Sequence, residues 1–408
     1  MIRPAGTDRT MDDAGSSGRV VACVVGTRPE AVKMAPVILR LRRAEGLRVR
    51  VISTGQHREL LDRALADFGI EADRDLGLMR PGQGLAEITA RALTALDGAF
   101  AAESPDFVLA QGDTTTVLAS ALTAYYRQIP FGHVEAGLRT GQPYRPFPEE
   151  KNRVLAGHLA AVHFAPTPQA RLNLLREGID AGSIHVTGNT GIDALRLAAG
   201  RPVPLPVEPA TGRMILVTAH RRENFGAPML EICAALRLVV ERDPDLCVVF
   251  PVHPNPAVRP TVEATLGGLA RVHLIDPVGY LEFVALMRAS FLILTDSGGV
   301  QEEGPSLGKP VLVLRDETER PEAVAAGTVR LVGPHRDPIL SAVEALTRDV
   351  DLYRRSATVA NPYGDGHAAE RIVPVLQRHF GIDPGPGPGP GPAAFDPAPA
   401  DPQAHFSA

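Results

Sequence analysis

Three carboxylates stand at positions where a sheet of parallel strands would expose them together. Asp113 follows the apolar run 107–111, Glu135 follows the run 129–134, and Glu149 lies beyond two prolines at the start of a helical pattern. If the two runs are neighbouring strands joined by a right-handed crossover, Asp113 and Glu135 emerge at one edge of the sheet. Acids and bases grouped in this way could move protons on a substrate. The structural alternative makes Asp113 a helix N-cap and Glu149 a partner of the helix dipole.

The segment GTRPEAVK, residues 26–33, has residue types suited to binding an anion. It follows the apolar run 20–25 and opens a helix, with Arg28 and Lys33 near the first turn. Free N–H groups at a helix start, together with two cations, would hold a phosphate. The alternative is a solvated helix start. G-x-G-x-x-G follows none of the expected strands, which argues against a dinucleotide cofactor.

A second candidate phosphate site lies in the C-terminal half of the chain. Residues 295–303 read TDSGGVQEE and follow another apolar run. Their small side chains would let a phosphate approach the N–H groups at Ser297, Gly298 and Gly299. One turn further on, Glu302 or Glu303 could accept hydrogen bonds from ribose hydroxyls.

His220 and Arg320 each follow another expected strand of the C-terminal half. His220, in TAHRREN, could act as a general acid or bind a phosphate, and the alternative is a structural histidine. Arg320 lies in LRDETERPEA, residues 314–323. Ser297 lacks the G-x-S-x-G surroundings of a nucleophile elbow. No His, Asp and Cys residues have the spacing of a metal site, and no cofactor is expected.

Apolar β-branched runs alternate with helical patterns throughout the interior, which is typical of parallel sheets covered on both faces. A proline-rich segment, residues 201–212, separates two such series. The sequence therefore predicts an α/β protein with two doubly wound domains and a cleft between them. Ligands bind beyond the carboxyl ends of strands in such sheets. The expected strands are 20–25, 49–54, 107–111, 129–134, 214–219, 246–251, 271–275, 291–295 and 310–314.

Composition narrows the class of protein. The 408 residues allow two hydrophobic cores, and a net charge of −5 argues against nucleic acid or an anionic membrane as the main partner. No apolar run reaches the roughly 18 residues that span a bilayer. Cys23, Cys233 and Cys247 lie in apolar runs, as buried thiols of a reducing compartment would. We expect a cytoplasmic protein whose ends, residues 1–18 and 381–408, are disordered.

Many motifs in order resemble one family, the bacterial non-hydrolysing UDP-N-acetylglucosamine 2-epimerases. The resemblance covers about residues 20 to 380. It implies the glycosyltransferase-B fold, with Rossmann-like domains at 19–187 and 188–361, the second binding UDP. A C-terminal helix at about 362–380 would return to the first domain. The motifs are GTRPEAVKMAP, TGQHRELLD, GDTTT, HVEAGLRTG, PEEKNR, GNTGIDAL, HRREN, LTDSGGVQEEGPSLGKPVLVLRDETERPEA and NPYGDG.

The resemblance implies reversible conversion of UDP-N-acetylglucosamine into UDP-N-acetylmannosamine for cell-surface polysaccharide synthesis. UDP would leave C1 as a base removes the C2 proton, and would add back to a 2-acetamidoglucal. By motif position the acid/base set would be Asp113, Glu135 and Glu149, with His220 near the diphosphate. Which carboxylate removes the C2 proton stays open. The residues that would hold UDP are Arg28, Lys33, Ser297, Gly298, Gly299, Glu303 and Arg320.

The family also implies an effector site and a homodimer. A second substrate molecule would bind beside the first, at Gln56, Gln83, Arg221 and His253. The motif HVEAGLR separates this branch from the hydrolysing one, so release of free N-acetylmannosamine is not expected. Two alternatives stay open: a glycosyltransferase of the same architecture that uses a UDP-sugar donor, and a non-catalytic nucleotide-sugar sensor.

Overall fold

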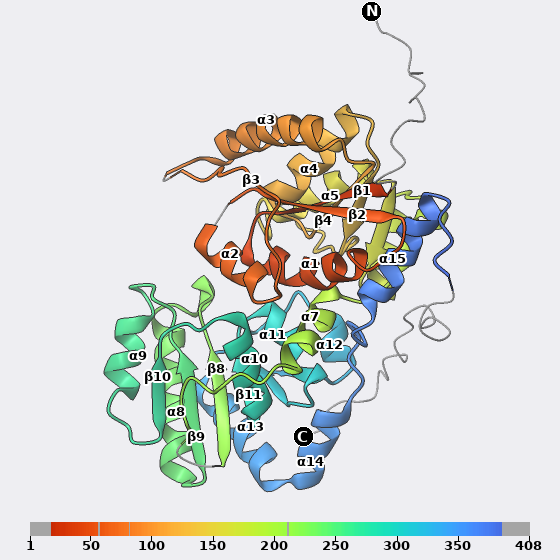
Figure 1. The fold of residues 1–408 in the computed structure, drawn as a ribbon. Helices are drawn as coiled ribbons and strands as arrows, with labels where there is room; N and C mark the ends of the chain where they lie inside the picture. Colours follow the sequence, from red (N-terminus) through yellow and green to blue (C-terminus); the bar gives the residue numbers. More distant parts are fainter. Residues whose placement is uncertain (1–17, 56–57, 81, 210–211, 386–408) are drawn as a thin grey trace, which may run out of the picture.

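The computed structural model describes residues 18–55, 58–80, 82–209 and 212–385 (Figure 1). The expected disorder of the N-terminal segment concerns residues that lie almost wholly outside these ranges, and so does most of the tail. Gln56 also lies outside them.

The first sheet has seven parallel strands in the order β3-β2-β1-β4-β5-β6-β7. This is a doubly wound order, since the chain starts at β1, moves out to one edge and then crosses to the other. The strands are β1 (Arg19–Val25), β2 (Leu47–Ser53), β3 (Arg74–Asp75), β4 (Phe107–Gln111), β5 (Phe131–Val134), β6 (Val162–Ala165) and β7 (Ile184–Val186). Their helices are α1 (Arg28–Leu41), α2 (Arg58–Ala66), α3 (Leu85–Glu103), α4 (Thr115–Tyr126), α5 (Glu149–Leu159), α6 (Pro168–Arg176) and the 3₁₀ turn η1 (Ala181–Ser183).

The second sheet has six parallel strands in the order β10-β9-β8-β11-β12-β13, which repeats the same winding. Its strands are β8 (Arg213–Thr218), β9 (Leu246–Pro251), β10 (Val272–Ile275), β11 (Leu292–Thr295), β12 (Val311–Val313) and β13 (Val329–Leu331). The helices of this half are α7 (Thr190–Ala199), η2 (Arg222–Asn224), α8 (Ala227–Arg242), α9 (Arg259–Leu266), α10 (Tyr280–Ala289), α11 (Gly298–Ser306), α12 (Pro321–Ala325), α13 (Arg336–Arg348) and α14 (Val350–Thr358).

Helices from both halves meet between the two sheets. Figure 1 shows α1 beneath the first sheet and α7, α10 and α11 above the second. One buried apolar cluster continues through this layer, from Val21 in β1 to Leu216 in β8. The last helix, α15 (Ala368–His379), runs back beside the first sheet and packs on α1 (Figure 1). The sites at the carboxyl ends of both sheets are therefore held close to each other.

Each expected strand corresponds to a strand of the structure, with ends that differ by a few residues. Neighbouring β4 and β5 are parallel, with Gln111 opposite Val134, as the argument for Asp113 and Glu135 requires. The sequence reading missed β3, β6, β7 and β13, each only two to four residues long. All three cysteines are buried, as expected.

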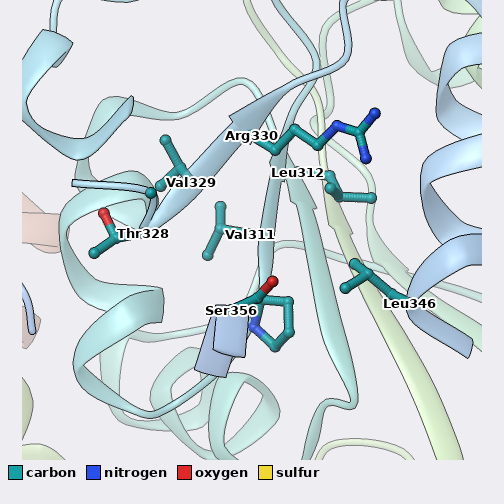
Figure 2. A pocket seen from close by; sticks show the side chains of 9 residues that line it. Val311, Leu312, Thr328, Val329, Arg330, Leu346 and Ser356 are labelled. Carbon is teal, nitrogen blue, oxygen red and sulfur yellow. The ribbon is translucent and has the colours of Figure 1, made fainter. Parts of the chain in front are cut away.

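A small void lies at the edge of the second sheet, away from the cleft. Figure 2 shows Val311, Val329 and Leu346 around it, with Ser356 of α14 nearby. Its volume is ≈ 10 Å³, close to the minimum for one water molecule, so it cannot hold a substrate. In the part of the chain that the structure describes, no helix combines the length and apolar character needed to cross a bilayer.

Candidate active site

A cavity of ≈ 570 Å³ lies between the two domains. Its walls bring together residues that are far apart in the sequence, including all three predicted acid/base carboxylates. Two of the predicted UDP-binding cations and one predicted effector residue also line it. These lining residues are Asp113, Glu135, Glu149, Lys33, Arg320 and Arg221. The volume is in the range of small-molecule sites.

Asp113 is not a helix cap. The N-cap of α4 is Thr114, whose side chain accepts a hydrogen bond from the Val117 N–H group. Asp113 instead lies 3.5 Å from the guanidinium of Arg153, and its carbonyl accepts a hydrogen bond from Asn152. The structural alternative for this carboxylate is therefore wrong, and its side chain is available at the cavity wall.

Glu135 is held in an unusual backbone conformation. Its φ is +63°, which non-glycine residues rarely adopt and which often marks a functional position. Its Oε2 lies 2.5 Å from Nζ of Lys33, and its side chain is 9% exposed. Burial raises the pKa of Glu135, and the charge of Lys33 opposes that rise. The result is a buried carboxylate whose proton affinity depends on the charged groups around it, Lys33 above all.

Glu149 is the first residue of α5, where its negative charge interacts favourably with the helix dipole, as expected. It also lines the cavity. Its neighbour Glu150 is buried and accepts hydrogen bonds from the N–H groups of Thr140 and Gly141. Arg153, one turn on, binds Glu150 at 3.1 Å. These contacts fix the loop before α5 and thus the place of Glu149. The sequence reading missed Glu150 and Arg153, whose only signal was their place in PEEKNR.

The start of α1 is not the open anion site that was expected. Glu30 occupies it, since its Oε2 accepts hydrogen bonds from the N–H groups of Gly26 (2.5 Å) and Thr27 (3.0 Å). This is a capping box, whose sequence sign is Thr27 followed by glutamate three residues later. Burial raises the pKa of Glu30 to about 7. Lys33 is bound to Glu135, which leaves Arg28 as the cation at this helix start.

Arg28 lies where both domains contribute charge. Its guanidinium is close enough to lower the pKa values of Glu303 and Tyr280, which belong to the second domain. Within the described ranges, the side chain of Arg28 makes no hydrogen bond and no ion pair. It is not among the residues that line the cavity of the three carboxylates. Arg28 is thus placed at the interdomain boundary, near the residue expected to hold ribose.

The small residues at the start of α11 allow other groups to lie close to its backbone. Ser297 is the N-cap and makes no side-chain capping bond. A Cβ atom at Gly298 would lie 2.8 Å from Cζ of Arg320, so the guanidinium occupies the space above this glycine. At Gly299 a Cβ atom would meet nothing within 4 Å. Gly298 and Arg320 therefore form one unit, which Glu302 completes by accepting a 2.9 Å hydrogen bond from Nε of Arg320.

Glu303, the predicted ribose ligand, already has a partner. The hydroxyl of Tyr280 donates a hydrogen bond to its Oε1 at 3.1 Å. Burial raises the pKa of Glu303 to about 7. Tyr280 also packs on Phe68 of the first domain, with ring centroids 6.0 Å apart. Its side chain thus lies at the domain boundary beside Glu303.

His220 lies apart from the carboxylates. It is not a lining residue of their cavity, its side chain is 41% exposed, and its ring stacks on that of His253 with centroids 6.0 Å apart. Its Nδ1 lies 3.3 Å from Oδ1 of Asp296. Partial removal of the ring from water lowers its pKa, and the charge of Asp296 opposes that fall. Asp296 is itself fully buried and accepts hydrogen bonds from the N–H groups of His220 and Arg221. Asp296 therefore fixes the conformation of the 220–224 turn.

Three of the four predicted effector residues are described: Arg221 and His253 belong to the second domain and Gln83 to the first. Arg221 lines the cavity and His253 stacks on His220. Gln83 bridges its own loop, where its amide donates to the carbonyl of Leu78 and accepts from the N–H group of Arg80. Within the described ranges no three His, Cys, Asp or Glu side chains are grouped to hold a metal ion.

Two doubly wound domains with a polar site in the cleft between them are the glycosyltransferase-B architecture, as predicted. The chain resembles a glycotransferase of kitacinnamycin in this respect, with a TM-score of 0.63 at 18% identity over 88% of this chain and 99% of that one. At such low identity the likeness shows the fold alone.

Closer relatives identify the family. The UDP-N-acetylglucosamine 2-epimerase family model matches residues 39–377. A UDP-N-acetylglucosamine 2-epimerase of Escherichia coli K12 is 52% identical over 374 residues, which are 88% of this chain and 98% of that protein. The chain belongs to the UDP-N-acetylglucosamine 2-epimerase family.

Two solved structures agree with this result. UDP-GlcNAc 2-epimerase from Neisseria meningitidis bound to UDP-GlcNAc has a TM-score of 0.81 and 46% identity, over 88% of this chain and all of that one. The MnaA–UDP structure of Staphylococcus aureus has a TM-score of 0.81 and 43% identity, over 93% of this chain and all of that one.

Proposed function

We propose that this chain interconverts UDP-N-acetylglucosamine and UDP-N-acetylmannosamine without hydrolysing them. The observation that carries the proposal is the cavity between the domains, where Asp113, Glu135 and Glu149 share one space with Lys33 and Arg320. Acids and bases that could act on a sugar therefore line the same space as cations that could bind its diphosphate. Membership of the family supports the same substrate.

The proposed reaction is an elimination followed by a re-addition. In the first step a carboxylate takes the proton from C2, the C1–oxygen bond breaks, and UDP departs with the bonding electrons. The product is a 2-acetamidoglucal with a C1–C2 double bond. In the second step UDP adds back at C1 and a carboxylic acid delivers a proton to the opposite face of C2. Groups on both faces are needed, which accounts for several carboxylates in one cavity.

The cations would stabilise UDP as it leaves. The C2 proton is not next to a carbonyl group, so the charge that develops on the departing diphosphate must be compensated to lower the barrier. Arg28, Lys33 and Arg320 are the proposed partners, with the N–H groups at the start of α11. His220 would act near the diphosphate from the neighbouring turn. Ser297 and Glu303 would hold the nucleotide.

Family resemblance supports three further proposals. A second UDP-N-acetylglucosamine would bind as an effector at Gln56, Gln83, Arg221 and His253. The chain would work as a homodimer, and its product would supply the synthesis of cell-surface polysaccharide.

Substitution of Glu149 tests the proposed chemistry. We expect Glu149→Gln to lower epimerase turnover about 10²-fold to 10⁴-fold, because one acid/base group is lost. UDP affinity, measured by calorimetry, should stay close to that of the parent chain. Glu241→Gln is the matched control, since Glu241 lies in an exposed pair with Arg237 on α8, and its turnover should not change. Loss of folding or of UDP affinity in Glu149→Gln would instead favour a structural role for this residue.

A further inference from the structure

A buried ionic network joins the two domains beside the candidate carboxylates. Glu302, on α11 of the second domain, lies with Oε2 at 3.7 Å from Nζ of Lys33, on α1 of the first domain. The same ammonium group lies 2.5 Å from Glu135. Two carboxylates from different domains therefore share one cation.

Glu302 is held rigidly in this place. Its Oε1 accepts a hydrogen bond from Nε of Arg320 at 2.9 Å, and its Oε2 accepts one from Nδ2 of Asn189 at 3.1 Å. Its side chain is 4% exposed. Burial alone would raise the pKa of Glu302, but the charges of Lys33 and Arg320 hold it below the usual value. Glu302 therefore presents a fixed negative charge to Lys33.

Glu135 has less support for its own charge. Its recorded ion pair is with Lys33 alone, within the described part of the chain. The positive charge of Lys33 favours ionised Glu135, while the negative charge of Glu302 acts on the same carboxylate in the opposite sense and disfavours an anion there. Arg139 and Arg153 pair elsewhere, with Glu177 and Glu150. The charged groups that face Glu135 are Lys33 of α1, Asp113 after β4, Glu302 of α11 and Arg320 before α12.

We propose that Glu302 is a positioning residue whose negative charge, set across the domain interface beside Lys33, offsets the effect of that ammonium group on Glu135, so that Glu135 can both take up and release a proton. The proposal rests on the proposed function, in which Glu135 exchanges a proton with the substrate. A carboxylate that is strongly stabilised as an anion is a weak base, and a reversible reaction needs proton affinity near the working pH. Since Glu302 and Glu135 belong to different domains, this balance exists only when the cleft has the arrangement seen here.

The test is the pH dependence of kcat in Glu302→Gln, which keeps the size of the side chain and removes its charge. The charge of Lys33 then stabilises ionised Glu135 without an opposing carboxylate beside it. The limb of the profile that belongs to Glu135 should move about one pH unit lower, whether Glu135 acts as base or as acid. Glu319→Gln is the matched control. Glu319 also binds Arg320, at 2.9 Å, but it makes no ion pair with Lys33. The limb of its profile should therefore stay at the parent pH, whatever its turnover.

A direct titration separates this proposal from the proposed function. In protein labelled with ¹³C at the glutamate carboxyl carbon, the Glu135 resonance is assigned by its loss in Glu135→Gln. It should titrate at lower pH in Glu302→Gln than in the parent chain, even if the parent shows no epimerase activity. An unchanged Glu135 titration in a folded Glu302→Gln protein would overturn the proposal. So would equal shifts in Glu302→Gln and Glu319→Gln, which would mean a general charge effect.

Discussion

The absence of a side chain at Gly298 lets Arg320 lie against the first turn of α11. The guanidinium cannot easily move aside, because Glu302 accepts from its Nε and Glu319 from its Nη1, both at 2.9 Å. A group fixed in this way meets a ligand without further ordering cost. The glycine at this position is therefore required for the placement of the Arg320 guanidinium.

We expect Gly298→Ala to weaken UDP binding about 10-fold to 100-fold, because its Cβ would displace the Arg320 guanidinium and remove a charge-assisted hydrogen bond. Calorimetric titration with UDP measures the effect. Gly98→Ala is the matched control. Gly98 lies within α3, a Cβ there meets nothing within 4 Å, and alanine should raise the free energy of unfolding by about 0.5–1 kcal/mol. Equal UDP affinity in both variants would contradict this account.

Some residues of the site could be found in the sequence and others could not. Asp113 and Glu135 stood out because each follows a strand, and adjacent strands in a doubly wound sheet end at one edge. Glu150 could not be told from Glu149, since both open the same helix. Which carboxylate faces the cavity and which one binds the loop depends on the turn of the chain before α5. The pairing of Lys33 with Glu302 depends on how the domains meet, which no local pattern encodes.

At the scale of elements, β5 positions Glu135 through a buried histidine. His133 lies two residues before it and is fully buried, with Nε2 at 2.7 Å from the carbonyl oxygen of Gly112. That carbonyl belongs to the turn which carries Asp113. The contact therefore ties the ends of β4 and β5 together. Burial lowers the pKa of His133 to about 3, so the ring is neutral in the folded protein.

This histidine should make the fold sensitive to acid. Below pH 6.5 the unfolded chain binds a proton at His133 that the folded chain excludes until about pH 3, so stability is lost as pH falls. Between pH 6 and pH 4 the parent should lose up to about 1.4 kcal/mol per pH unit from this group. His133→Gln removes the titrating ring, and its free energy of unfolding, measured with denaturant at several pH values, should fall less steeply. Parallel pH dependences in the two proteins would show that His133 is not the source.

Elements differ in how well the sequence defines them. The central strands were predictable because each is an apolar run that is buried on both faces of its sheet. The strands β3, β6, β7 and β13 were not, because their two to four residues carry too little pattern. Their pairing is set by the longer strands beside them. The short loop segments that carry site residues could not be predicted for the same reason, because they too have few residues.

At the scale of the whole molecule, two crossings of the chain hold the domains in place. The first crossing leads into α7 and the second leads into α15. Asp193 of α7 accepts hydrogen bonds from the N–H groups of Ala368 and Ala369, so it caps α15 and joins the two crossings. Asn361 donates to the carbonyl of Glu302 at 2.6 Å. The segment NPYGDG thus connects the crossings to Glu302, which pairs with the shared cation Lys33.

The two-domain architecture followed from composition and from the alternation of strands and helices. The return of α15 followed only from family resemblance, because its periodicity fits either domain. Contacts such as that of Asp193 with α15 join residues more than 170 positions apart, and sequence pattern does not reach that far. The sequence predicted that a cleft would lie between the domains. Which charged residues face each other across it could be seen only in the structure.

Solvent deuterium at C2 tests the central claim most directly. The chain is incubated with UDP-N-acetylglucosamine in D₂O without an acceptor, and the sugars are followed by proton NMR. The account predicts that UDP-N-acetylmannosamine forms with deuterium at C2, and that the remaining UDP-N-acetylglucosamine also loses its C2 proton, because the elimination is reversible. Absence of both exchange and epimer, under conditions where calorimetry shows that the nucleotide sugar binds, would contradict it.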